Sequence, residues 1–167
     1  MILCHFLKVI RTRGLCQPLP IEKRVIMVSR RKFHVLVVDD GEGMTTPTVE
    51  MLERLGYSAQ GETQSLAALK AFSEDPDKFD LAIVEPVMPE LPVRSMRRSS
   101  PITPELTGLE LAMRFRRIRP GFPVLLYTED IKPSLEEEIR AAGLGAAILK
   151  PLGLKDLKEA VGEGLRS

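Results

Sequence analysis

Three carboxylate side chains follow apolar stretches that read as buried strands. Asp39 and Asp40 come directly after residues 33–38, and Glu85 comes directly after residues 81–84. Clustered carboxylates repel one another unless a cation or a lysine compensates their charge. Mg²⁺ is held in proteins by a few carboxylate oxygens together with carbonyl oxygens and waters. The sequence therefore indicates a magnesium site with Asp39, Asp40 and Glu85 as its ligands.

A hydroxyl and an ammonium group mark the ends of two further apolar runs. Thr128 closes residues 122–128, and Lys150 follows residues 146–149. Threonine and lysine side chains can hold the oxygens of a transferred phosphoryl group. Together with the carboxylates, these groups favour a site for phosphoryl chemistry.

Each of these residues also has a purely structural interpretation. Asp39 and Asp40 could cap the first helix, as aspartates beside a glycine often do. Thr128 could simply cap the end of its strand. Glu85 and Lys150 could form an ion pair that holds the fold together without any role in signalling.

Apolar runs alternate with helix-like segments along residues 33–165. The runs predict strands at 33–38, 57–60, 81–85, 122–128 and 146–151. The segments of helical periodicity predict helices at 46–56, 63–72, 107–118, 134–145 and 153–165. Strands that are apolar on both faces belong to a parallel sheet covered by helices on both sides. The pattern predicts an α/β fold with a doubly wound five-stranded parallel sheet, whose site lies at the carboxyl ends of the strands.

Two of the predicted helices carry specific start signals. Thr46 is expected to be the N-cap of the first helix, with Pro47 at its first helical position. Ser134 is expected to be the N-cap of the fourth helix, where Glu137 would complete a capping box.

Two segments fall outside this alternation. Residues 1–32 form a basic leader, because residues 1–33 hold eight basic residues and one acidic residue. The leader lacks interleaved aromatic residues, so a solvated and poorly ordered tail is favoured over a nucleic-acid contact. Residues 91–105 separate the third strand from its helix and exceed the ~2–6 residues usual for such a connection. They are interpreted as an inserted loop in a domain that spans 33–167.

The cysteines and the N-terminal end indicate the cellular setting. Cys4 and Cys16 both lie in the leader and form no CxxC motif, so neither a disulfide framework nor a zinc site is supported. A reduced, cytoplasmic setting is therefore expected. The apolar residues 1–10 are too few to span a bilayer and lack the order of a signal peptide, so no membrane association is expected.

Five short motifs, taken in order, resemble one known family. They are "VVDD" at 37–40, Met88-Pro89, "TGLELA" at 107–112, Thr128, and Lys150-Pro151. In this order and spacing the chain resembles the CheY-like receiver domains of response regulators in two-component signalling, over about residues 33–165. The stretch 107–128 is also similar to the terminal receivers of hybrid sensor kinases. The resemblance makes Met27 a natural start, with residues 1–26 either an over-extended reading or a remnant of a larger protein.

The resemblance implies a strand order of 2-1-3-4-5 and a role for each site residue. Asp39 and Asp40 match the acidic pair that holds Mg²⁺. Thr128 and Lys150 match the residues that bind the phosphoryl oxygens and relay the switch. Glu85 stands where the family has the aspartate that accepts a phosphoryl group from a kinase histidine.

Three departures from the family pattern predict an altered function. Glu85 is one methylene longer than aspartate, and acceptor geometry is unforgiving because phosphoryl transfer depends on positioning. Ala147, three residues before Lys150, replaces the usual aromatic switch residue. Glu129 follows Thr128, where the family prefers a small residue. We therefore expect a pseudo-receiver that binds Mg²⁺ weakly and is not an enzyme.

The expected partners are a sensor histidine kinase or an output protein. The partner surface implied by the resemblance comprises residues 135–142, 146–149 and 154–165, which belong to the fourth helix, fifth strand and fifth helix. A homodimer through the same face is a further expectation, and direct nucleic-acid binding is not expected.

Two other functions remain open from the sequence. The domain could still be a working receiver that a histidine kinase phosphorylates, on Glu85 or on one of the paired aspartates. It could also be a metal-dependent phosphohydrolase with Asp39 or Asp40 as nucleophile. That class needs a second aspartate two positions after the nucleophile, and neither residue has one. No glycine-rich phosphate loop is present either.

Overall fold

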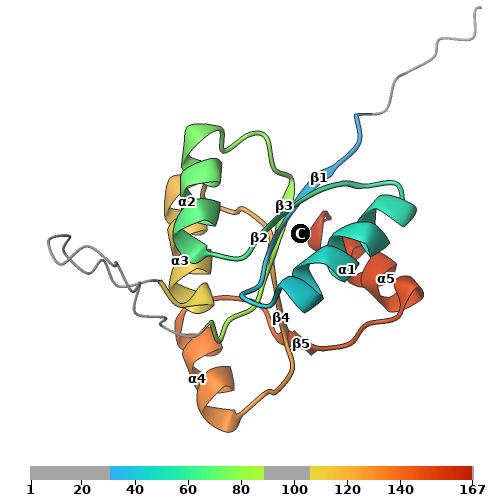
Figure 1. Cartoon of the computed structure of the whole chain (residues 1–167). Helices are drawn as coiled ribbons and strands as arrows, with labels where there is room; N and C mark the ends of the chain where they lie inside the picture. The colour runs from blue at the N-terminus through green and yellow to red at the C-terminus, as the bar shows by residue number, and fades with distance from the viewer. Residues whose placement is uncertain (1–30, 89–105, 167) are drawn as a thin grey trace, which may run out of the picture. The chain divides into compact units, whose positions relative to one another are not determined.

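Five parallel strands form the centre of the structure, a computed structural model that describes residues 31–88 and 106–166. The strands are β1 (His34–Val38), β2 (Ser58–Glu62), β3 (Leu81–Val84), β4 (Val124–Thr128) and β5 (Ala147–Leu149). The helices are α1 (Glu42–Arg54), α2 (Ser65–Glu74), α3 (Gly108–Ile118), α4 (Pro133–Ala141) and α5 (Leu154–Gly164). The strand order is β2-β1-β3-β4-β5, which confirms the predicted fold class and topology (Figure 1).

Two predicted segments lie outside the described residues. The inserted loop predicted at 91–105 lies there entirely, as does the leader predicted at 1–32 apart from its last two residues. Within the described ranges, no helix combines the length and the apolar character that a membrane crossing would require.

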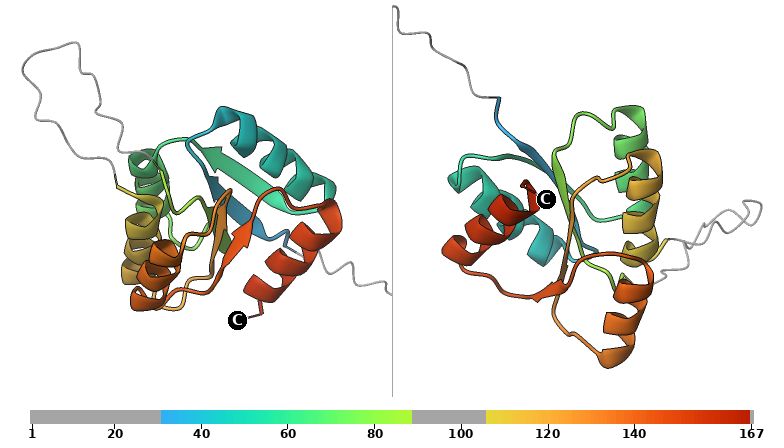
Figure 2. Two further views of the ribbon diagram at one scale, coloured as in Figure 1. Left: turned by 90° about the horizontal axis from the view of Figure 1, so that it is seen from below. Right: turned by 180° about the vertical axis from the view of Figure 1, so that it is seen from behind.

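Helices cover both faces of the sheet. α1 and α5 (teal and red) lie on one side, and α2, α3 and α4 (green, yellow and orange) lie on the other (Figure 2). The residues of β1 contribute to the cores on both faces of the sheet, because successive side chains of a strand point to opposite faces. Val35 and Val37 join the core beneath α1 and α5, whereas Leu36 and Val38 join the core beneath α2, α3 and α4.

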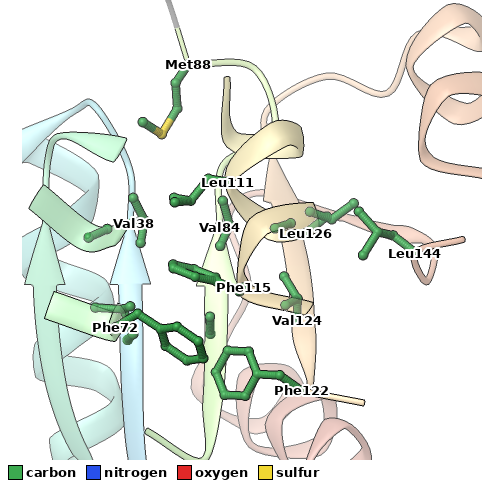
Figure 3. Close-up of a cluster of buried hydrophobic side chains, with 14 of the residues drawn as sticks. Val38, Phe72, Val84, Met88, Leu111, Phe115, Phe122, Val124, Leu126 and Leu144 are labelled. Atoms are coloured by element: carbon green, nitrogen blue, oxygen red, sulfur yellow. The ribbon is translucent and has the colours of Figure 1, made fainter. Parts of the chain in front are cut away.

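Four phenylalanines pack together in the core beneath α2 and α3. The ring centroid of Phe72 lies 4.5 Å from that of Phe115 and 4.6 Å from that of Phe122 (Figure 3). Phe79 stacks on Phe72 with a centroid distance of 6.2 Å. The Arg119 guanidinium lies 4.2 Å from the Phe122 centroid and donates to the Phe79 carbonyl at 2.8 Å. This cluster ties α2 and α3 to the sheet at the end opposite the strand carboxyl termini.

The predicted start of the first helix is wrong by five residues. α1 begins at Glu42 with Gly41 as its N-cap, and the Thr45 N–H already donates to the Gly41 carbonyl at 3.0 Å. Pro47 therefore lies inside the helix, not at its first position. Because proline has no N–H, Pro47 leaves the Gly43 carbonyl without its helical donor.

The predicted capping box of the fourth helix is also wrong. α4 starts at Pro133 with Lys132 as N-cap, and no side chain caps it. The fixed φ of proline suits the first helical position, so the helix begins one residue before Ser134. The capping box is found instead in α3, where Thr107 accepts from the Glu110 N–H and the Glu110 carboxylate accepts from the Thr107 N–H.

Candidate functional site

The carboxyl ends of four strands meet around one pocket of about 660 Å³. Every residue predicted to carry out the chemistry lines it, and these are Asp39, Asp40, Glu85, Thr128 and Lys150. The N-terminal ends of α3 and α4 complete the wall, through residues that include Thr107, Leu109, Ser134 and Leu135. The structure therefore brings together side chains that lie up to 111 positions apart in the chain.

A buried lysine joins two of the three carboxylates. The Lys150 Nζ donates to Glu85 Oε2 at 2.8 Å and also to Asp39 Oδ2. The side chains of Lys150, Asp39 and Glu85 are only 4%, 9% and 8% exposed. We call these three residues the buried triad. Its lysine carries one positive charge between two carboxylates, and water is almost excluded from all three.

Glu85 is fixed by hydrogen bonds of both its backbone and its carboxylate group. Its N–H donates to the Val38 carbonyl at 2.9 Å, and its Oε1 accepts from the Val87 N–H at 3.0 Å. With Oε2 bound to Lys150, both carboxylate oxygens have a donor. The Glu85 carboxylate is therefore held in one place.

The start of α3 packs directly on the backbone of Glu85. A Cβ placed on Gly108 would lie 1.7 Å from the Glu85 carbonyl oxygen, which is far inside van der Waals contact. Only glycine fits at this position. The Leu109 N–H, one residue further on, donates to the Pro86 carbonyl at 3.3 Å. This close approach fixes the wall of the pocket relative to Glu85.

Asp39 has the turn role that the sequence left open, and its second carboxylate oxygen binds the lysine of the buried triad. Its Oδ1 accepts from the Gly41 N–H at 3.0 Å, which is the turn role, while its Oδ2 binds Lys150. The Thr45 hydroxyl donates to the Asp39 carbonyl at 2.9 Å and fixes the peptide behind it. Asp40, in contrast, is exposed at the pocket wall.

Thr128 turns its hydroxyl toward its own loop. The Thr128 Oγ1 donates to the Asp130 carbonyl at 3.3 Å, which supports the capping interpretation, although the residue is buried at the pocket wall. Its carbonyl accepts from the Lys150 N–H at 2.7 Å, so Thr128 also sets the backbone position of Lys150. Glu129 is exposed and lines the same pocket.

Ala147 lies away from the buried triad. It pairs with Leu126 in the sheet and lines a separate hollow of about 260 Å³, together with Ile139 and Leu144. This hollow lies beside α4 and β5. The methyl group of Ala147 is partly buried against the core beneath α4.

The predicted magnesium ligands are of the right chemical type but are already engaged. Among residues 31–88 and 106–166, no three acidic, histidine or cysteine side chains are placed to share one metal ion. Both oxygens of Asp39 and both of Glu85 have donors, and Asp40 is the one predicted ligand that is exposed. The Lys150 ammonium group supplies the positive charge here, so this arrangement does not fit a resident metal.

The buried triad raises the pKa of Lys150. Burial by itself disfavours the charged ammonium group, but hydrogen bonds to Asp39 and Glu85 and their negative charges outweigh it. The pKa of Lys150 therefore lies above its usual value of 10.5.

A prediction for alkaline pH follows from this direction. A raised lysine pKa contributes stability that is complete below the unfolded value of 10.5 and is lost as the pH rises through the folded value. The free energy of unfolding, measured with urea, should therefore fall as the pH rises above 10.5. An NMR titration of the Lys150 ¹³Cε resonance should give a midpoint above 10.5, and a midpoint at or below 10.5 would contradict the triad.

Sequence reasoning missed one aromatic residue of the site. The Tyr127 hydroxyl accepts from the Leu152 N–H at 2.9 Å, and the Lys150 Nζ lies 5.4 Å from the centroid of its ring. The signal was its place in β4, directly before Thr128 and therefore on the opposite face of the sheet.

Comparisons with known proteins agree with this fold. No protein-family model matches the chain. The response regulator receiver protein CpdR of Brucella abortus (strain 2308) is 26% identical over 123 residues, which cover 74% of this chain and 88% of CpdR. The CheY-like receiver domain protein of Methanospirillum hungatei JF-1 superposes with a TM-score of 0.65 at 25% identity, covering 81% of this chain and 94% of that one. Vibrio cholerae CheY4 gives 0.64 at 22% identity, covering 79% and 98%.

The fold and these similarities define the class of protein. The chain carries a response-regulator receiver domain of the CheY-like type, a component of two-component signalling. Receiver domains are generally signalling modules rather than enzymes, and they generally bind Mg²⁺ at the phosphorylation site.

Proposed function

We propose that this receiver domain is a pseudo-receiver, which regulates a partner by protein–protein contact without ordinary aspartyl phosphorylation. One observation carries the proposal. The residue at the acceptor position, Glu85, is almost fully buried, and both of its carboxylate oxygens are bound, one by Lys150 and one by the Val87 N–H.

Phosphorylation of Glu85 would have to break this arrangement. Phosphoryl transfer depends on placing the acceptor oxygen in line with the donor, and a glutamate carboxylate lies one methylene further along its side chain than an aspartate carboxylate. Lys150 would also have to leave a buried carboxylate, which is costly in a site with little water. The Glu85–Lys150 pair instead partly imitates the contact that a phosphorylated acceptor would make with this lysine.

The proposed partner is a sensor histidine kinase or an output protein, met in the cytoplasm. The proposed contact is the face of α4, β5 and α5, where Leu149 and Leu154 are 51% and 44% exposed. These side chains would be available to a partner at this face. A homodimer would use the same face, and we propose no direct contact with nucleic acid or a membrane.

A working receiver is the second candidate function. Asp39, Thr128 and Lys150 line one pocket at the carboxyl edge, as phosphoryl chemistry would require. Under this alternative Glu85, or one of the aspartates, accepts the phosphoryl group, and Mg²⁺ binding at Asp39 and Asp40 accompanies it.

Intact-mass spectrometry after incubation with Mg²⁺ and acetyl phosphate distinguishes the two. We expect no phosphoryl adduct on the wild type and an adduct on Glu85→Asp, because aspartate restores the shorter acceptor. The matched control is Glu159→Asp, the same exchange at an exposed position of α5. Adding Asp39→Asn to Glu85→Asp should abolish the adduct.

The other outcomes have clear meanings. An adduct on the wild type would overturn the pseudo-receiver proposal and establish a working receiver. An absence of adduct on both wild type and Glu85→Asp would show that Glu85 is not what blocks phosphorylation, and would count against the observation that carries the proposal.

A further inference from the structure

Tyr127 connects the two sides of β4. Its neighbours Leu126 and Thr128 belong to the α4 side and to the pocket wall, respectively. The Tyr127 side chain lies in the other core, with Leu157 and Val161 of α5, and the residue is 7% exposed. It is therefore a member of the core that holds α5 on the sheet.

The same side chain reaches the buried triad and the start of α5. The Lys150 Nζ lies 5.4 Å from the ring centroid, within the range of a cation–π contact. The hydroxyl accepts from the Leu152 N–H at 2.9 Å, and Leu152 immediately precedes Gly153, the N-cap of α5. One aromatic residue thus contacts both the triad lysine and Leu152, in the short connection between that lysine and the helix.

We propose that Tyr127 is a positioning residue that couples the Lys150–Glu85 ion pair to the position of α5. The inference rests on the proposed function and deepens it, because α5 belongs to the surface assigned to the partner. It gives the domain a route from its pocket to that surface.

The contacts around Lys150 explain why the route runs through Tyr127. The Lys150 backbone is fixed by its hydrogen bond to the Thr128 carbonyl, so a change in its ion pairs moves the side chain rather than the strand. That movement changes the charge over the Tyr127 ring. The ring is packed among α5 residues, and its hydroxyl holds Leu152, so the change reaches the start of α5. Ala147 cannot take this role, because its methyl group faces the core on the α4 side.

The test combines Glu85→Gln, which removes the charge paired with Lys150, with changes at Tyr127. Amide NMR shifts of Leu154–Gly164 are recorded for Glu85→Gln in the wild-type, Tyr127→Phe and Tyr127→Leu backgrounds. We expect Glu85→Gln to shift α5 amides in the wild-type background. Tyr127→Phe, which keeps the ring and loses the hydroxyl, should reduce those shifts, and Tyr127→Leu should largely remove them.

Stability measurements provide a second readout on the same proteins. A double-mutant cycle between Glu85→Gln and Tyr127→Phe should show a coupling of about twofold or more in the unfolding equilibrium constant. The matched control is Tyr57→Leu, since Tyr57 packs against the same core and is the only other tyrosine of the chain. It should lower stability without changing the α5 response to Glu85→Gln.

The proposal is overturned if the α5 shifts caused by Glu85→Gln are the same in the wild-type and Tyr127→Phe backgrounds. It is also overturned if Tyr57→Leu reduces them as much as Tyr127→Leu does, which would mean a general packing effect. None of these readouts uses phosphorylation. A phosphoryl adduct on the wild type would therefore refute the pseudo-receiver while leaving the coupling itself measurable.

Discussion

Lys150→Met should destabilise the domain by about 3–5 kcal/mol, because it leaves two buried carboxylates without their cation. The side chains of Asp39 and Glu85 are each less than a tenth exposed, so water can stabilise their negative charges only slightly. Small domains are typically stable by only about 5–15 kcal/mol, so a large part of the total would be lost. Urea unfolding followed by circular dichroism, in a buffer free of divalent cations, measures the difference.

Magnesium should partly reverse this loss in the variant. Once the ammonium group is gone, the oxygens of Asp39 and Glu85 are available to a hard cation, and binding to the folded state alone raises stability. The melting temperature of Lys150→Met should therefore rise with Mg²⁺ far more than that of the wild type. Lys155→Met, an exposed lysine in α5, is the control and should behave as the wild type. An equal response of wild type and Lys150→Met to Mg²⁺ would contradict the arrangement described for the buried triad.

Phe72→Ala should destabilise the domain by about 3–5 kcal/mol through the cavity it creates. Phe72 is fully buried, and its ring contacts those of Phe79, Phe115 and Phe122. The three surrounding aromatic rings belong to one helix and two loops, so they cannot all collapse into the space. Chemical denaturation measures the change in unfolding free energy.

The location of the damage is part of this prediction. The phenylalanine cluster lies at the end of the core away from the strand carboxyl termini, so folded Phe72→Ala should keep the wild-type ¹³Cε resonance of Lys150. Leu66→Ala is the control on the same helix, because Leu66 is exposed and its truncation should cost less than about 1 kcal/mol. A comparable loss in both variants would show that the buried rings do not carry the stability assigned to them.

The fold was predictable because its signals are local and repeated. β1 and β3 are apolar at every buried position, and alternation with periodic helical segments leaves few arrangements other than a doubly wound sheet. The helix starts were less predictable. Pro47 and Ser134 are strong signals for a helix start. However, α1 begins earlier, directly after its N-cap Gly41, and α4 begins at Pro133.

The site was predictable in its location and less so in its contacts. Strand ends placed Asp39, Glu85 and Lys150 at one edge, and a Glu85–Lys150 pair was among the interpretations of the sequence. Lys150 also binds Asp39, and this second contact depends on side-chain geometry that the spacing of residues in the sequence does not specify. The role of Tyr127 depends on a hydrogen bond between β4 and the loop that follows β5, and residue types alone do not specify such a bond.

The contact between Gly108 and the Glu85 carbonyl has a consequence for how such a domain can change in evolution. It fixes the start of α3. The buried side chain of Met88 fixes the residues that follow β3. The pocket wall is thus set by two anchors and not by the number of residues between them. A lineage could therefore change the length or composition of the intervening residues without redesigning the buried triad.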